Sequence, residues 1–209
     1  MRQGSTKKTI LDTIAIFCVK RIANCFWDIA DNWSYKNEKI AELYDKTISQ
    51  EYRKEYEHCD ISSKKHILHI GSGSYPLTEM MLASCSSGDI VGIDKNLKTV
   101  IKAQQVVQRK KLQDRISIQH GDGCNVAAED FDAVVISSCS LPKVKILEHV
   151  LQKVKPDSTV IVREVDIATK DIFSCITAHP DFTLKKQISH NPFPFIEPFG
   201  WTSFCLIKK

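Results

Sequence analysis

The sequence predicts an α/β protein, and three observations carry this prediction. A short apolar segment, 67–70, runs into a turn that contains Gly71 and Gly73. A second apolar segment ends in Asp94, about 20 residues further along the chain, the distance typical of nucleotide-binding βαβ units. Apolar segments and amphipathic stretches then alternate up to the end. A strand, a glycine turn and a helix start place free backbone N–H groups over the edge of a parallel sheet, where nucleotide-like ligands bind.

Length and composition predict how the chain is divided. With 209 residues, of which 43% are hydrophobic and 26% charged, the chain can bury a full core. We expect a helical N-terminal cap over residues 1–60 and a ligand-binding domain over residues 61–209. The net charge is only +4, and the basic clusters 7–8 and 109–111 are typical of solvated helix ends. We therefore expect no nucleic-acid partner.

The cysteines and the N-terminal apolar segment indicate the cellular location of the protein. Eight cysteines are scattered without a CxxC pair, which favours reduced thiols and disfavours a structural metal site. Charged residues interrupt the apolar segment 10–29, so it cannot span a bilayer. We expect a cytoplasmic protein with no membrane partner and no bound metal.

Two helices are predicted ahead of the glycine turn. The first, over residues 6–30, has a stripe of apolar residues at spacings of three and four; these are Leu11, Ile14, Cys18, Ile22, Cys25 and Ile29. The stripe could pack on the rest of the chain, which is its commonest use, or on a second copy, or on a membrane surface. The second helix, over residues 34–57, is more polar and could close over a ligand.

The remaining elements follow from apolar runs and their breakers. Helices are expected at 77–84, 97–112, after Pro142, and at 167–178. The almost wholly apolar run 131–136 suits the centre of a parallel sheet. Further strands are expected at 89–94, 115–119, 158–165, 182–189 and 200–207. The loop at 190–200, rich in proline and phenylalanine, could either wall a pocket or cover the sheet edge.

Two acidic residues stand where ligand-binding side chains are expected. A carboxylate at Asp94 could accept hydrogen bonds from both hydroxyls of a ribose. Asp122 lies between Gly121 and Gly123 after the third strand, where an adenine amino group would need an acceptor. An isolated Gly-Asp-Gly turn is equally typical of an exposed surface turn, so its position one strand after Asp94 is what favours a role in binding.

These motifs resemble the class I S-adenosylmethionine-dependent methyltransferase superfamily. The resemblance rests on Gly71-Ser-Gly73, Asp94, Gly121-Asp-Gly123, Phe131-Asp132 and Val154-Lys-Pro-Asp157, and it covers residues 64–209. It implies a Rossmann-like seven-stranded, mostly parallel sheet with an antiparallel last strand, and S-adenosylmethionine as the cofactor. The residues expected to bind this cofactor are Gly71, Ser72, Gly73, Asp94, Lys95, Asp122, Gly123, Ser137 and Ser138.

A narrower pattern is similar to the nicotianamine synthase family. It consists of Ile70-Gly-Ser-Gly with Pro76-Leu-Thr78, Leu141-Pro-Lys143 and the strand 160–163. This resemblance implies transfer of the aminocarboxypropyl group to an amine in place of the methyl group, and both donor chemistries stay open. Pro76 stands where a dinucleotide-binding GxGxxG turn has its third glycine, which disfavours a nicotinamide cofactor.

Transfer from a sulfonium needs an acceptor held about 3–3.5 Å from the carbon under attack, with water excluded. If the acceptor is protonated, a general base helps; the candidates near the expected cleft are Tyr75, Glu164, His190 and Tyr44. The sequence has no Asn-Pro-Pro-Tyr motif after the fourth strand, which disfavours methylation of a base or amide nitrogen.

The sequence therefore predicts an S-adenosylmethionine-dependent transferase, with methyl transfer to a small molecule favoured. Aminocarboxypropyl transfer is the second hypothesis. A third hypothesis is a non-catalytic binding module of the same fold that forms a homodimer through its N-terminal helix.

Overall fold

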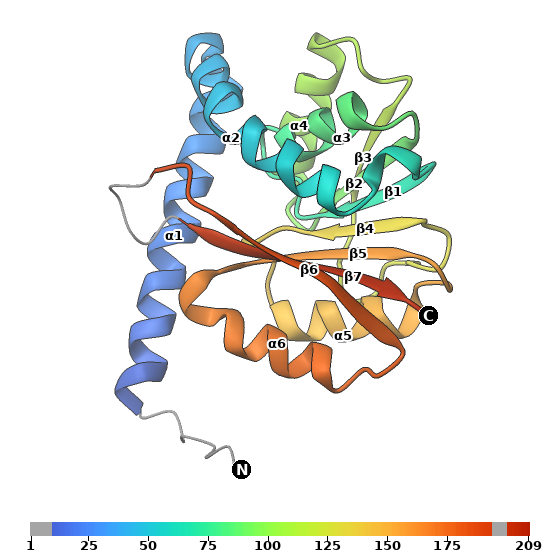
Figure 1. Ribbon diagram of the computed structural model, residues 1–209. Helices are drawn as coiled ribbons and strands as arrows, with labels where there is room; N and C mark the ends of the chain where they lie inside the picture. Colours follow the sequence, from blue (N-terminus) through green and yellow to red (C-terminus); the bar gives the residue numbers. More distant parts are fainter. Residues whose placement is uncertain (1–9, 194–199) are drawn as a thin grey trace.

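The computed structural model describes residues 10–193 and 200–209, and Figure 1 shows its arrangement. The sheet has seven strands in the order β3-β2-β1-β4-β5-β7-β6. All neighbours from β3 to β5 are parallel, and β7 is antiparallel to both β5 and β6. The predicted seven-stranded, mostly parallel sheet with an antiparallel last strand is confirmed. The strands are β1 (His66–Ile70), β2 (Asp89–Asp94), β3 (Ile116–His120), β4 (Ala133–Ile136), β5 (Thr159–Val165), β6 (Phe182–His190) and β7 (Trp201–Lys208).

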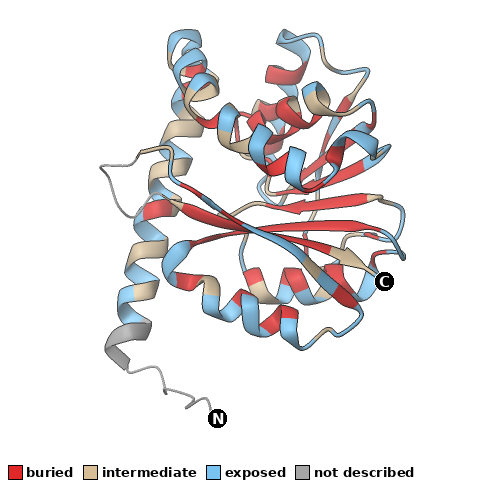
Figure 2. Cartoon of the chain, in the orientation of Figure 1, coloured by how far each residue is buried: buried red, intermediate tan, exposed pale blue. Residues whose placement is uncertain are grey.

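The centre of the sheet is apolar on both faces because helices cover both. Every residue of β4 and β5 is buried (Figure 2). One face packs against α2 (Glu38–His58), α3 (Leu77–Cys85) and α4 (Leu97–Arg109), and the other packs against α5 (Lys143–Lys153) and α6 (Thr169–Thr177). The edge strand β6 has exposed residues along its middle. This layering leaves the carboxyl ends of the parallel strands free for a site.

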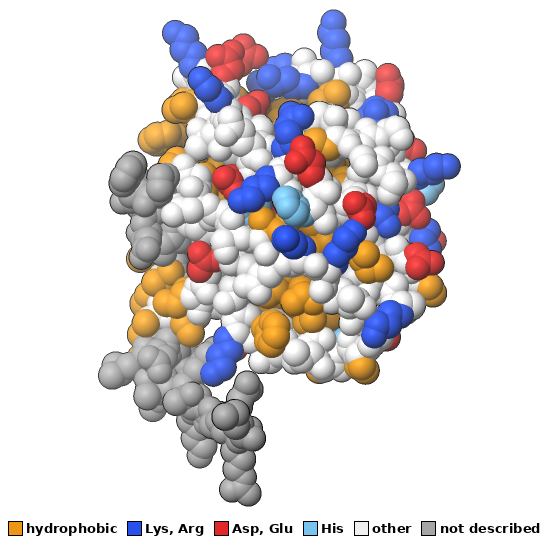
Figure 3. All heavy atoms as spheres, in the orientation of Figure 1, with side chains coloured by type: hydrophobic (Ala, Val, Ile, Leu, Met, Phe, Trp, Pro, Cys, Tyr) orange, Lys and Arg blue, Asp and Glu red, His pale blue; other side chains and the backbone are white. Residues whose placement is uncertain are grey.

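The first helix, α1 (Ile10–Lys36), is longer than predicted and is turned differently. Its apolar stripe does not pack on the rest of the chain, since Ile14, Ile22 and Ile29 are 53%, 56% and 46% exposed. Cys18 and Cys25 are exposed as well. Figure 3 shows hydrophobic atoms along the edge of the molecule where α1 runs. The side of α1 that faces the body carries the buried Ala23 together with Ile16.

Composition explains why the sequence left the use of this stripe open and why its commonest use, packing on the rest of the chain, is not the one observed. The first half of the helix is apolar on nearly every side, so more than one stripe fits a period of 3.6 residues. In α4 the large apolar residues Leu97 and Ile101 are likewise 56% and 47% exposed. There the smaller Ala103 and Val106 are buried instead. Periodicity predicted the helices, whereas the sheet decided which side of each is buried.

Three remaining predictions concern the loop before the last strand, membrane-spanning helices and the cysteines. Residues 194–199 of the loop rich in proline and phenylalanine lie outside the described residues, so its two suggested uses stay predictions. Within residues 10–193 and 200–209, no helix is long and apolar enough to cross a membrane. The eight cysteines are all free thiols.

Candidate functional site

The glycine turn after β1 closes back onto the end of β2. The backbone N–H groups of Gly71 and Ser72 both donate to the carbonyl of Ile93, at 2.8 and 3.1 Å. Gly71 has φ = +97° and Gly73 has φ = +70°, a region that side chains with a Cβ rarely adopt. A Cβ on Gly71 would lie 2.3 Å from Ser140 Oγ, in the segment that follows β4. The turn is therefore tightly enclosed by a second loop.

The N-terminal helix contacts the same turn from the opposite side. A Cβ on Gly73 would lie 1.9 Å from Asp31 Oδ2, which places this carboxylate of α1 directly over the turn. Asp31 accepts hydrogen bonds from the backbone N–H groups of Ser74 and Tyr75. These are free donors just ahead of α3, which favour a negative group. An internal carboxylate thus fills the position that an anionic ligand group would take.

Asp94 ends β2 beside the turn, as the spacing predicted. Its Oδ2 accepts from Gly73 N at 3.2 Å and its Oδ1 accepts from Asn96 N at 2.9 Å. A carboxylate oxygen can accept more than one hydrogen bond, so both oxygens keep capacity for ribose hydroxyls. The neighbouring Lys95 donates to the carbonyl of Leu141 at 3.2 Å, and this bond links the loops that follow β2 and β4.

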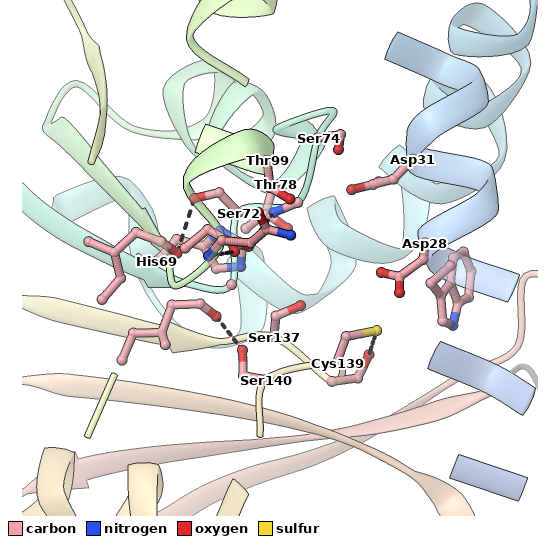
Figure 4. Close-up of a pocket in the computed structure, with 18 of the residues that line it drawn as sticks. Asp28, Asp31, His69, Ser72, Ser74, Thr78, Thr99, Ser137, Cys139 and Ser140 are labelled. Atoms are coloured by element: carbon pink, nitrogen blue, oxygen red, sulfur yellow. Dashed lines mark hydrogen bonds between the residues drawn. The ribbon is translucent and has the colours of Figure 1, made fainter. Parts of the chain in front are cut away.

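A cavity of about 370 Å³ lies between these loops and the two N-terminal helices (Figure 4). Its volume falls in the usual range for small-molecule sites. The structure brings together around it all nine residues expected to bind the cofactor. Asp122, on the far side, has its Oδ1 committed to Cys124 N at 2.9 Å, and its other oxygen remains to accept a donor. The left-handed turn, the acidic end of β2 and a cavity of this size fit a nucleoside with an amino-acid arm.

Two of the four candidate bases line the cavity. Burial and the neighbouring Asp45 raise the pKa of Tyr75, whose hydroxyl donates to Asp45 Oδ2 at 3.0 Å. Burial, reinforced by Asp31, raises the pKa of Tyr44 well above its usual value. Both phenols stay protonated at neutral pH, so they are suited to donating hydrogen bonds rather than to removing a proton.

The other two candidates lie outside the cavity. The Glu164 side chain is buried and accepts from Lys20 Nζ of α1 at 2.7 Å and from Val165 N at 2.9 Å. His190 stacks on Trp201 with ring centroids 4.8 Å apart, and its Nδ1 lies 2.9 Å from Glu51 Oε2. The expectation that Glu164 and His190 lie at the cleft is therefore corrected. Because strand neighbours alternate, it is Arg163 and not Glu164 that faces the cavity.

Arg163 joins the sheet to the cap at the floor of the cavity. Its guanidinium, 2% exposed, binds Glu55 of α2 through Nε and Nη2, the shortest contact being 2.7 Å. Nη1 donates to Thr78 at 2.9 Å, and the guanidinium carbon lies 3.9 Å from the ring centroid of Tyr52. A fully desolvated pair of this kind fixes the position of α2 because breaking it would leave a buried charge.

Sequence reasoning missed the contribution of α1 to the cavity. Asp28 and Asp31 point from this helix toward the glycine turn, and Ser137 and Cys139 lie across from them (Figure 4). Burial raises the pKa of both carboxyls, and Asp28 is raised further by Asp94. A signal was present, since the two acidic residues are three positions apart in an apolar helix and so share one face.

The segment after β4 adds two unusual side chains. Burial raises the pKa of the Cys139 thiol to about 12, so this thiol is not an activated nucleophile. Burial lowers the pKa of Lys143 to about 8, and its ammonium donates to the carbonyl of Ser137. Within the described part of the chain, no group of three or more His, Cys, Asp or Glu side chains could hold a metal ion.

The sheet order, the glycine turn and the acidic end of β2 define a class I S-adenosylmethionine-dependent methyltransferase fold, and the cofactor is S-adenosylmethionine. Residues 17–166 match the family model of the protein-L-isoaspartate(D-aspartate) O-methyltransferase, PCMT. The chain belongs to this family.

Individual relatives are distant. A ribosomal RNA small subunit methyltransferase A from Corynebacterium diphtheriae is 28% identical over 97 residues, which cover 45% of this chain. The matched region spans only 33% of that protein. The chain therefore matches only about a third of the length of this relative.

Two solved structures differ in how much of the chain they match. A mutant of MtNAS in complex with S-adenosylmethionine has a TM-score of 0.74 and 13% identity, and covers 96% of this chain and 80% of its own. The Bacillus subtilis tRNA methyltransferase TrmK has a TM-score of 0.59 and 16% identity, and covers 77% of this chain and 65% of its own. The expected similarity to nicotianamine synthase is thus structural.

Proposed function

We propose that this protein transfers the methyl group of S-adenosylmethionine to a small molecule bound in the cavity beneath α1 and α2. The observation that carries the proposal is the enclosure of the glycine turn and Asp94 by both helices, which leaves a cavity of about 370 Å³. Such a volume suits a cofactor with a small acceptor better than it suits a folded macromolecule. When bound, the cofactor supplies a carbon activated by a sulfonium.

We assign some cavity residues to binding the cofactor and others to excluding water from the reacting carbon. We assign Gly71–Gly73, Asp94 and Lys95 to the nucleoside and its arm, Asp122 and Gly123 to the adenine, and Ser137 with Ser138 to the space near the reacting carbon. Tyr44 and Tyr75 would donate hydrogen bonds and exclude water. Asp31, whose pKa is raised well above its usual value by burial, is the carboxylate that we assign to an acid–base role.

Calorimetry tests the site assignment. We expect S-adenosylhomocysteine to bind the wild type and to bind Asp94→Ala at least tenfold more weakly, since a hydrogen-bonded carboxylate contributes roughly 1.5–3 kcal/mol. Asp130→Asn, at an exposed position away from the cavity, is the matched control. Equal affinity for the wild type and Asp94→Ala would remove Asp94 from the site.

Aminocarboxypropyl transfer is the second candidate, and one observation favours it. The MtNAS structure covers 96% of the chain, so its match extends into the N-terminal helices, whereas TrmK covers 77%. Product analysis separates the two chemistries because methyl transfer leaves S-adenosylhomocysteine and aminocarboxypropyl transfer leaves methylthioadenosine. A protein that binds the cofactor but forms neither product with any metabolite extract would support the non-catalytic binding module.

We also propose that the chain forms a homodimer through the outward stripe of α1. The stripe includes Phe17 and Trp33, which are 59% and 58% exposed, besides the isoleucines already described. An exposed apolar row of this length is typical of an interface. Light scattering on the wild type and on Ile22→Glu tests this; a wild type that is monomeric at high concentration would exclude the dimer. The free thiols favour the reducing cytoplasm as the location.

A further inference from the structure

The cavity has a part that the nucleoside would not fill. Beyond the glycine turn it extends between α1, α2 and the ends of β5 and β7, where four rings line it: Trp27, Tyr44, Tyr52 and Trp201. We call these four residues the aromatic compartment. Trp27 contacts Tyr44 and Trp201 with ring centroids 6.1 and 6.0 Å apart, and Tyr52 contacts Trp201 at 6.0 Å. The rings therefore form one continuous wall.

The charge beside the aromatic compartment is negative. Asp28 and Asp31 extend into the cavity from α1 (Figure 4), and Trp27 and Asp94 line the same cavity. Burial raises the pKa of both carboxyls, and repulsion adds to it, from Asp94 on Asp28 and from Asp28 on Asp31. A cation placed between these carboxylates would relieve that repulsion, and aromatic faces attract cations as well.

Arg163, at the floor of the cavity, does not cancel the negative charge of Asp28 and Asp31. Arg163 is paired with Glu55 through two of its nitrogens and stacks against Tyr52. Its charge is thus balanced within the protein before any ligand arrives. The other cation among the described lining residues is Lys95, which donates to the carbonyl of Leu141 at 3.2 Å. A carboxylate placed beside Asp28 and Asp31 would be repelled by these two groups.

Two buried ring nitrogens among the lining residues point to a polar ligand. His69 is 1% exposed and Trp201 is 4% exposed. Neither His69 Nε2 nor Trp201 Nε1 has a hydrogen-bond partner within the described residues. Unsatisfied buried polar groups are uncommon in native proteins and call for an explanation. A ligand with polar groups that fills the cavity would satisfy them.

We propose that Asp28 and Asp31, with the aromatic compartment, form a binding site for an ammonium group. This inference rests on the proposed function and narrows its substrate class. The ammonium belongs either to the amino-acid arm of the cofactor or to the acceptor. If the ammonium belongs to the acceptor, the site selects against an acceptor with a carboxylate at that position, although the PCMT family is described by an aspartate O-methyltransferase.

A comparison of two nucleosides tests the first source. S-adenosylhomocysteine carries an α-ammonium, whereas methylthioadenosine keeps the nucleoside and thioether but lacks the amino acid. If the ammonium of the cofactor is bound, Asp28→Asn weakens S-adenosylhomocysteine by about tenfold or more and leaves methylthioadenosine unchanged in calorimetry. Asp130→Asn, an exposed position outside the cavity, is the matched control and should change neither.

A pair of small ions tests the second source. Protein saturated with S-adenosylhomocysteine is titrated with propylammonium and with butanoate, which are similar in size and opposite in charge. If the acceptor's ammonium is bound, propylammonium binds, butanoate does not, and Asp28→Asn weakens propylammonium by about tenfold or more. Asp31→Asn serves as a second variant, because an asparagine oxygen can still accept from the turn.

Two results would overturn the inference: butanoate binding as tightly as propylammonium, or neither aspartate variant changing any of these affinities. Both are distinct from failure of the proposed function. If the proposed function fails, S-adenosylhomocysteine and methylthioadenosine do not bind the wild type at all, and the affinities of the variants cannot be compared.

Discussion

Two neighbouring residues of β5 hold the two cap helices in different ways. Arg163 points to one face of the sheet and binds Glu55 of α2, whereas Glu164 points to the other face and binds Lys20 of α1. Both side chains of the Arg163–Glu55 pair are almost fully buried, but the Lys20 side chain is 21% exposed. Strand β5 thus holds α2 through a buried ion pair and α1 through an ion pair that is partly exposed to solvent.

This difference indicates which helix can move. Arg163 and Glu55 share further bonds with Thr78, Tyr56 and Ser203, so α2 cannot leave without exposing several unpaired groups. For α1 the ion pair is supplemented by the small cluster of Ala23, Val165 and Ala168, by the packing of Trp27 on Trp201, and by hydrogen bonds that join Asn32 and Tyr35 to α4 and have at least one partly exposed member. We infer that α2 is a fixed wall of the cavity and that α1 is the part of the cap more readily displaced.

The largest expected effect comes from breaking the α2 network. Arg163→Met should lower the free energy of unfolding by roughly 3–5 kcal/mol, because it leaves the Glu55 carboxylate buried and unpaired. Urea denaturation measures this. Adding Glu55→Met should recover part of the loss, since two apolar side chains leave no buried charge. A single variant as stable as the wild type would contradict the assignment of Arg163 as the anchor of α2.

A smaller effect is expected for the α1 pair. Lys20→Met should cost about 1–2 kcal/mol, because Glu164 keeps its bond from Val165 N and lies in the field of Lys143. Hydrogen exchange should show faster exchange in α1 while α2 is unchanged, and this contrast is the sharper measurement. Equal acceleration in both helices would mean that they move as one unit.

The smallest expected effect is a pH dependence at the end of the α2 network. Burial lowers the pKa of His190; Arg163 lowers it further, while Glu55 and Glu51 oppose the shift. The folded pKa thus lies below the unfolded value of about 6.5. The resulting stability is complete above that value and is lost as the pH falls below it, because the unfolded chain binds more protons. His190→Gln should flatten the unfolding free energy between about pH 6.5 and 5 by roughly 1 kcal/mol or less.

The sheet and the cofactor side of the cavity could be predicted because their signals are local. Glycines at a strand end and an acidic residue at a fixed spacing follow from backbone geometry, and all of them line the cavity. The pairing of Arg163 with Glu55 joins residues 108 positions apart, so no local pattern carries it. The orientation of α1 likewise depended on which of its apolar sides the body covers.

The start of β4 is another feature that the local sequence pattern did not predict correctly. The fourth strand was expected from Phe131, but β4 begins at Ala133. The backbone of Asp132 already bonds to His66 and Thr159, at 2.8 and 3.0 Å, and its side chain makes further bonds. Its Oδ2 accepts the backbone N–H groups of Lys65 and His66 at 3.1 and 3.0 Å, and its Oδ1 pairs with Lys155. Lys155, together with the two backbone bonds, lowers the pKa of Asp132 to about 2. A residue that looked like the start of a strand instead holds the start of β1.

The contacts of Gly71 and Gly73 have a consequence for how this chain can vary in evolution. An added Cβ at Gly71 would meet the segment after β4, and one at Gly73 would meet Asp31 of α1. The two glycines are therefore constrained by different neighbours, over and above their positive φ. Substitutions at position 73 should covary with position 31, and those at position 71 with position 140. A relative without the N-terminal helix would be released from the first constraint but not from the second.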